Sequence, residues 1–153
     1  NFGKDNNIDV VIARIFNPIG AGMAEKFLIP RLLDQIYALE VDSGMVEISR
    51  KDSIRDYIDV RDLAVAIGLL SEGKTKHHVY NIGSGIGTTN YQLVEAILQQ
   101  VAPEKDIKIV ETSSEPERQV ASQADISRLK DEFGWEPRYT ITDTIKELIN
   151  AKV

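Results

Sequence analysis

The stretch "VVIARIFNPIGAG", residues 10–22, decides the fold class. Its first part, Val10 to Ile15, is a continuous run of mostly β-branched residues. Such a run is typical of a strand that is covered on both faces in a parallel sheet. Asn17, Pro18 and the glycines that follow predict a loop at the carboxyl end of that strand. The stretch therefore predicts an α/β fold, in which ligands bind where the strands end.

Strands and helices alternate through the rest of the chain. Strands are expected at residues 46–48, 79–82 and 107–110, and helices at residues 29–40, from Asp62, behind Thr89, from Asp125 to Phe133 and from Thr142. Asp62 is expected to cap the helix that it begins, and Thr89 opens a capping box. Gly134 is expected to stop the helix before it. This alternation again indicates an α/β protein.

Length and composition restrict the class of protein. The 153 residues are about the size of one domain, and the net charge of −6 argues against a nucleic-acid surface, which needs a basic face. The absence of cysteine excludes a disulfide framework and fits a reducing cytoplasm. No apolar run approaches the ~20 residues that a membrane span needs. We therefore expect a cytoplasmic protein without a signal peptide that binds neither nucleic acid nor membrane.

Two polar side chains mark a candidate anion site. Asn17 follows the first strand, where its amide could donate to a phosphate or a sugar hydroxyl, or could only bond its own backbone in a turn. Arg55 carries a planar guanidinium that suits phosphate. The neighbouring Asp56, Asp59 and Asp62 offer the alternative of a surface ion-pair network. The residues alone leave both alternatives open.

Other polar residues point to no reaction. His77 and His78 have no third metal ligand nearby, so no metal site is expected, and no Ser-His-Asp arrangement is evident. Trp135 follows a helix stop and is expected to pack in the core. Arg61 and the carboxylates of the 115–117 segment are expected to be solvated. The "GSGIG" loop at residues 83–87 lacks the spacing of a dinucleotide fingerprint.

Five segments in order resemble the extended short-chain dehydrogenase/reductase family of nucleotide-sugar epimerases, dehydratases and reductases. They are "ARIFNPIGAG" (13–22), "FLIPRLLDQI" (27–36), "SIRDYIDVRDLAVAI" (53–67), "VYNIGSG" (79–85) and "ADISRLKDEFGWEPRYTITDTI" (124–145). The "FN" and "RDYIDVRD" segments look most like GDP-4-keto-6-deoxy-mannose reductases, and UDP-glucose 4-epimerases show similar ones. The resemblance implies the C-terminal portion of a Rossmann-like enzyme, with the last sheet strands and a small substrate-binding α/β subdomain.

The resemblance also implies roles for individual residues. Asn17 would hydrogen-bond the sugar nucleotide, and Arg55 would bind its diphosphate. Pro18 and Ile19 would lie near the nicotinamide end of NAD or NADP. The base and ribose pocket would be lined by Phe27, Leu28 and Ile29. Asp56 and Asp62 look structural, one orienting the arginine segment and one capping a helix.

Two features depart from the family pattern. The family often has an arginine directly before a proline as a second diphosphate ligand, but this chain has Glu115 there, and Arg118 is left to take that role. The family's glycine-rich cofactor loop and Tyr-x-x-x-Lys pair do not occur, because no tyrosine has a lysine four residues on. The resemblance therefore implies a single substrate-binding fragment over residues 1–153, with no catalytic residue, whose N-terminal dinucleotide-binding half is absent.

Two hypotheses of different classes follow. In the first, the chain supplies the nucleotide-sugar clamp, for a GDP- or UDP-linked sugar, of an NAD(P)-dependent epimerase, dehydratase or reductase, and is inactive alone. In the second, it is a free-standing, non-enzymatic binding or assembly module. The strand at residues 10–15 would pair with strands of the missing half. Without those neighbours its edges and apolar faces are exposed, so we expect the isolated chain to associate, for example as a homodimer.

Overall fold

The structure is a computed structural model that describes residues 6, 8–39, 43–72, 74–112 and 121–152. Its strands are β1 (Ile12–Ile15), β2 (Asn17–Ile19), β3 (Ser43–Ile48), β4 (Ile54–Asp59), β5 (Val79–Ile82), β6 (Gly87–Thr89) and β7 (Asp106–Glu111). Its helices are α2 (Leu28–Tyr37), α3 (Val60–Glu72), α4 (Asn90–Val101), α5 (Ser127–Phe133) and α6 (Ile141–Lys152). This alternation of strands and helices agrees with the α/β fold that the sequence predicted.

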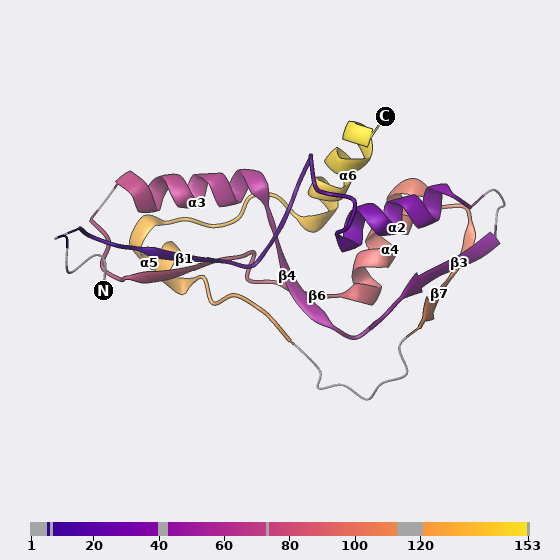
Figure 1. The fold of residues 1–153 in the computed structure, drawn as a ribbon, viewed down its shortest axis with the longest axis horizontal. Coiled ribbons are helices and arrows are strands. Elements are labelled where there is room, and N and C mark those ends of the chain that lie inside the picture. Colours follow the sequence, from indigo (N-terminus) through magenta and orange to yellow (C-terminus); the bar gives the residue numbers. More distant parts are fainter. Residues whose placement is uncertain (1–5, 7, 40–42, 73, 113–120, 153) are drawn as a thin grey trace.

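The strands form three small sheets, and most of their pairs are parallel. β1 pairs with β5 and β3 pairs with β7, both in parallel, while β4 lies between parallel β2 and antiparallel β6. Figure 1 shows β1, α3 and α5 at one end of the elongated molecule and α2, α4, β3 and β7 at the other. β4 and β6 lie between these two ends.

Each end of the molecule has its own hydrophobic cluster. The larger cluster is built around α2, β3, α4 and α6 and includes Leu32, Val46, Leu93 and Ile145, which are all buried. The smaller cluster combines residues of β4, α3, β5 and α5 with Trp135, which is buried as the sequence predicted. β4 contributes to both, since Ile58 belongs to the smaller cluster and Tyr57 packs against the larger one.

Local capping signals set several helix ends. Thr89 and Gln92 form the predicted capping box at the start of α4. Asp125 accepts a hydrogen bond of 3.0 Å from the backbone N–H of Ser127 at the start of α5. Gly134 ends α5 in the left-handed conformation, with φ 65°, where glycine lacks the steric penalty of other residues. These boundaries were readable from sequence because each signal acts within a few residues.

Two predicted helix starts are wrong. Asp62 does not cap α3, which begins at Val60; Asp59 accepts the backbone N–H of Arg61 at 2.8 Å instead. The last helix begins at Ile141 rather than at Thr142. There the hydroxyl of Thr140 accepts the backbone N–H of Asp143 at 3.2 Å, and the Asp143 carboxylate accepts that of Thr140 at 2.9 Å. In both cases a neighbouring residue with an equally good cap makes the bond.

The first strand is exposed, contrary to the prediction of a strand covered on both faces. Ile12 and Ile15 remain 53% and 45% exposed. Among the described residues, β1 has β5 as its sole strand partner. Nothing in the described part of the chain covers its outer edge, so the apolar run is left at the surface. No helix within the described ranges has the length and apolar character that crossing a membrane requires.

Candidate functional site

The candidate site is built on one face of the paired strands β2 and β4. Asn17 on β2 stands opposite Tyr57 on β4 in the parallel register. Because side chains alternate along a strand, Arg55 and Tyr57 share one face of β4, and Asp56 and Ile58 share the other. Asn17, Arg55 and Tyr57 are therefore brought to the same face, although the first two lie 38 positions apart along the chain.

A pocket of about 530 Å³ opens at this face. Its wall contains every described residue to which the resemblance gave a binding role: Asn17, Pro18, Ile19, Phe27, Leu28, Ile29 and Arg55. The predicted second diphosphate ligand, Arg118, lies outside the described residues, as does Glu115. The pocket thus gathers side chains from the β2 segment, the start of α2 and β4 into one concave surface.

Asn17 ties the two strands together. Its side-chain amide donates a hydrogen bond of 2.8 Å to the backbone carbonyl oxygen of Asp56. The sequence offered a local turn bond as the alternative to ligand binding, but this bond joins β2 to β4 instead. The amide group is thereby held at the pocket wall in a defined orientation.

Arg55 lies on the pocket wall between Ser53 and Tyr57. Its Nη1 donates to the backbone carbonyl oxygen of Ile54 at 2.9 Å. The guanidinium of an arginine has five N–H donors in a planar fork. The residue also stands close enough to Tyr57 to influence the pKa of that phenol.

The aspartates that the sequence offered as ion-pair partners of Arg55 accept hydrogen bonds from other groups. Asp56 is fully buried and accepts from the Ser84 N–H and hydroxyl at 2.6 and 2.7 Å. It also accepts from the backbone N–H groups of Gly85 and Ala124 at 3.0 and 2.9 Å. Asp56 therefore clamps the loop after β5 and the 121–124 segment onto β4, which agrees with the structural role expected for it.

Asp62 joins distant parts of the chain. Its carboxylate accepts the backbone N–H groups of Arg138 and Tyr139, both at 2.9 Å. The bonds attach the segment that leads into α6 to the first turn of α3. Asp62 is thus structural, as expected, but through a contact across the fold rather than as a helix cap.

Asp59, which is buried, forms an ion pair with Arg61, which is partly exposed. The prediction that Arg61 is only solvated is therefore wrong. Arg61 donates from Nη2 to Asp59 at 2.7 Å, pairs with Glu147 on α6 and lies 3.5 Å from the ring centroid of Tyr139. Burial alone would raise the pKa of Asp59, but hydrogen bonds from Arg61 and Thr144 outweigh it and hold that pKa below its usual value. The pair fastens α3 to α6.

Sequence reasoning missed six residues of the pocket wall: Phe16, Met23, Ser49, Ser53, Tyr57 and Asn90. The alternation of β4 could have revealed Tyr57, because it stands two residues from Arg55. Asn90 had no such signal. Its backbone N–H donates to the Ser53 carbonyl at 3.1 Å and its amide to the Arg50 carbonyl at 2.7 Å, so the tertiary fold brings the start of α4 to the pocket.

Tyr57 has a perturbed environment. Burial raises the pKa of its phenol, and the positive charge of Arg55 opposes that rise without cancelling it. The phenol therefore keeps its proton near neutral pH and remains a hydrogen-bond donor.

The described ranges bring together no group of three His, Cys, Asp or Glu side chains that could hold a metal ion.

A family model described as GDP-mannose 4,6 dehydratase matches residues 1–148. The chain belongs to this family. Because the relatives of the chain include nucleotide-sugar reductases, dehydratases and epimerases, the resemblance to the extended short-chain dehydrogenase/reductases is confirmed.

Curated relatives match the chain over about half of their own length. This chain is 31% identical over 146 residues to GDP-6-deoxy-D-mannose reductase of Pseudomonas aeruginosa. The match covers 92% of this chain and 47% of the reductase. It is 27% identical over 151 residues to dTDP-6-deoxy-L-talose 4-dehydrogenase (NAD(P)(+)) of Kitasatospora kifunensis, covering 95% of this chain and 46% of that enzyme.

Solved structures show the same fold. The structure of RMD from Pseudomonas aeruginosa complexed with NADPH superposes with a TM-score of 0.80 at 28% identity, over 98% of this chain and 50% of that one. The dTDP-glucose 4,6-dehydratase of Bacillus anthracis in complex with NAD also gives a TM-score of 0.80, at 23% identity over 99% and 46%. These matches confirm the Rossmann-like fold class that the resemblance implied.

Proposed function

We propose that the chain forms the nucleotide-sugar-binding part of an NAD(P)-dependent nucleotide-sugar epimerase, dehydratase or reductase. The observation that carries the proposal is the pocket on the β2–β4 face, which joins Asn17 and Arg55 with the apolar start of α2. A concave site with an apolar wall and a few convergent polar groups is typical of small-molecule recognition.

The wall residues match the parts of a nucleotide sugar by chemistry. Arg55 suits the diphosphate, because a planar guanidinium fork can donate to two anionic oxygens at once. The amide group of Asn17 can bond a phosphate or sugar oxygen beside it. The apolar Phe27, Leu28 and Ile29 suit the flat face of a base and its ribose. We assign Arg118 to the second side of the diphosphate.

The nicotinamide cofactor fits this chain at one end only. Pro18 and Ile19 belong to the pocket wall, where an apolar surface would suit one side of a nicotinamide ring. When bound, the cofactor would accept or donate a hydride at a sugar carbon. Pro18 and Ile19 would lie against the ring and help to set its position.

The remaining machinery is assigned to another segment of the full protein. The relatives with similar sequences are about twice as long as this chain, and one of them carries NAD(P)(+) in its name. We place the dinucleotide-binding half and the Tyr-x-x-x-Lys pair in such a segment. The 153-residue chain alone should then show no turnover, because it has neither the proton-moving tyrosine nor the cofactor loop.

Calorimetric titration of the full-length protein with GDP-sugars and UDP-sugars tests this function. We expect saturable binding of at least one of the two classes, and hydride transfer to NAD or NADP with the bound sugar. Binding of neither class would contradict the proposal. The reading frame upstream offers a second test, since a glycine-rich βαβ unit and a Tyr-x-x-x-Lys pair encoded there distinguish the enzyme from a free-standing binding module.

A further inference from the structure

The pocket wall contains a further hydrogen-bond donor beside Arg55, the hydroxyl of Tyr57, to which the sequence assigned no role. Tyr57 follows Arg55 by two residues on β4, so the two side chains rise from the same face of the strand. Asn17 stands opposite Tyr57 in the register. All three residues line the same pocket. Tyr57 therefore occupies the middle of a polar row that an anionic ligand would meet.

The ring of Tyr57 is packed, and its position is therefore set by the fold. It lies against the hydrophobic cluster of α2, β3, α4 and α6, while part of the residue remains at the pocket. Packing of this kind needs the ring but not the hydroxyl, which a phenylalanine would lack. Buried tyrosines usually have a hydrogen-bond partner for the hydroxyl.

We propose that the hydroxyl of Tyr57 donates a hydrogen bond to an anionic phosphate oxygen of the nucleoside diphosphate that Arg55 holds. This inference rests on the proposed function and adds a positioning residue to it. Arg55 supplies the charge, and the hydroxyl fixes which oxygen faces the strand. A hydrogen bond from a hydroxyl to an anionic oxygen is short and about twice as strong as one between neutral groups. The raised pKa of the phenol keeps this donor protonated near neutral pH.

The decisive variant is Tyr57→Phe in the full-length protein, because it keeps the ring and removes the hydroxyl. Affinity is measured by calorimetry for GDP, UDP, guanosine and uridine. We expect the affinity for the bound diphosphate to fall about tenfold. The affinity for the corresponding nucleoside, which has no phosphate oxygen, should stay within about twofold of the parent. The thermal midpoint should also remain unchanged, since the packed ring is retained.

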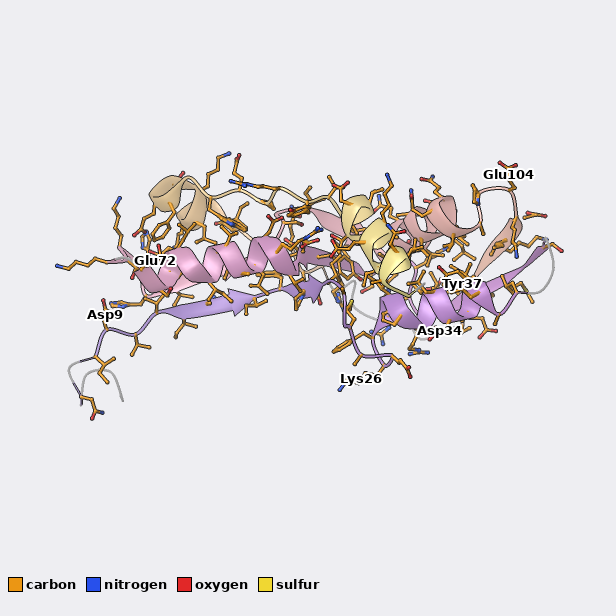
Figure 2. The ribbon with its side chains drawn as sticks, turned by 90° about the horizontal axis from the view of Figure 1, so that it is seen from above. Asp9, Lys26, Asp34, Tyr37, Glu72 and Glu104 are labelled. Atoms are coloured by element: carbon orange, nitrogen blue, oxygen red, sulfur yellow. The ribbon has the colours of Figure 1, made fainter. Side chains whose placement is uncertain are left out.

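Tyr37→Phe is the matched control. Tyr37 is the last residue of α2, half exposed and outside the pocket, and Figure 2 shows it at the end of that helix, apart from the loop that holds Lys26. It should leave all four affinities unchanged.

The outcomes separate this inference from the proposed function. Unchanged GDP and UDP affinities in Tyr57→Phe, or an equal loss for the nucleosides, would overturn the role of the hydroxyl while leaving nucleotide-sugar binding intact. A parent protein that binds neither diphosphate would overturn the proposed function, and this inference with it. A loss confined to the diphosphates supports the inference.

Discussion

The side-chain amide of Asn17 lies 2.8 Å from the backbone carbonyl oxygen of Asp56 and donates a hydrogen bond to it. This bond crosses from β2 to β4 at the level of the pocket. It fixes the spacing between the strand that carries Asn17 and the strand that carries Arg55. The shape of the candidate site therefore depends on a contact between residues 39 positions apart.

Replacement of Asn17 should weaken the fold at this point. We expect Asn17→Ala to lower the free energy of unfolding by about 1 kcal/mol through the lost hydrogen bond. Asn17→Asp should cost more, about 2 kcal/mol, because an acidic acceptor then faces the carbonyl oxygen of Asp56. Urea denaturation of the full-length protein measures both. Asn150→Ala, at an exposed position on α6, is the control. Equal losses in all three variants would contradict the bond's role.

Arg55→Ala should weaken binding of GDP- or UDP-sugars by roughly 1–3 kcal/mol, because it removes a charge-assisted bond to phosphate. The affinity of Arg55→Lys should lie between those of the unchanged protein and Arg55→Ala, since an ammonium keeps the charge but loses the planar fork. Calorimetry of the full-length protein gives the affinities. Arg31→Ala, an exposed position on α2 that does not line the pocket, should bind as the parent does. An unchanged affinity in Arg55→Ala would return Arg55 to the surface-network alternative.

The clamp at Asp56 predicts a sharp contrast between two glycines. A Cβ at Gly83 would lie 2.5 Å from the Ala124 Cβ and 2.9 Å from Asp56 Oδ2, whereas one at Gly68 on α3 meets nothing within 4 Å. Gly83→Ala should therefore destabilise by about 2 kcal/mol or more, and Gly68→Ala should stabilise by roughly 0.5–1 kcal/mol through its helix propensity. Thermal unfolding compares them. Equal midpoints in the two variants would refute a tight clamp.

Removal of the carboxylate itself should be costlier. Asp56→Ala leaves the backbone donors of Ser84, Gly85 and Ala124 without their acceptor in a buried place, and we expect a loss of more than about 3 kcal/mol. Denaturant titration of the full-length protein measures the loss. Asp131→Asn on α5, at an exposed position, should change stability by less than about 0.5 kcal/mol.

The contribution of Asp59 should depend on pH. The pKa of this carboxyl lies below its ordinary value of 3.8, because hydrogen bonds from Arg61 and Thr144 outweigh the effect of burial. A lowered folded-state pKa means that the stabilisation is fully present above the ordinary value and is lost as the pH falls through the folded-state value. We expect Asp59→Asn to destabilise by about 2 kcal/mol at pH 7. Its deficit should shrink in denaturation series run from pH 5 down to pH 2, and a deficit constant over that range would argue against this linkage.

The exposed first strand should make the 153-residue chain associate. β1 leaves Ile12 and Ile15 at the surface, and Val65 and Ile67 of α3 are also about half exposed. Apolar side chains beside an open strand edge favour pairing with another copy. Sedimentation of the purified chain should show concentration-dependent dimers or larger species. Ile12→Lys should reduce them, and Ile86→Lys, in the loop after β5, should not. A monodisperse monomer at high concentration would contradict the prediction.

The amino-acid sequence by itself determined the local parts of this protein. Strand β5 and helix α4 with its capping box follow from hydrophobic spacing and from side chains that bond within three residues. The left-handed stop at Gly134 is equally local. The family resemblance, rather than spacing, also named seven of the thirteen residues of the pocket wall, which lie around Asn17, around Phe27 and at Arg55.

Only the tertiary structure decided the distant partners of several charged side chains. Asp62 bonds the backbone before α6 instead of its own helix, and the partly exposed Arg61 also lies over the ring of Tyr139. The start of α4 reaches the pocket through Asn90. A carboxylate gains as much from a distant donor as from a near one, and a guanidinium gains as much from a distant acceptor as from a near one. The choice depends on which groups the packed hydrophobic clusters bring together. Spacing along the chain carries no record of that choice.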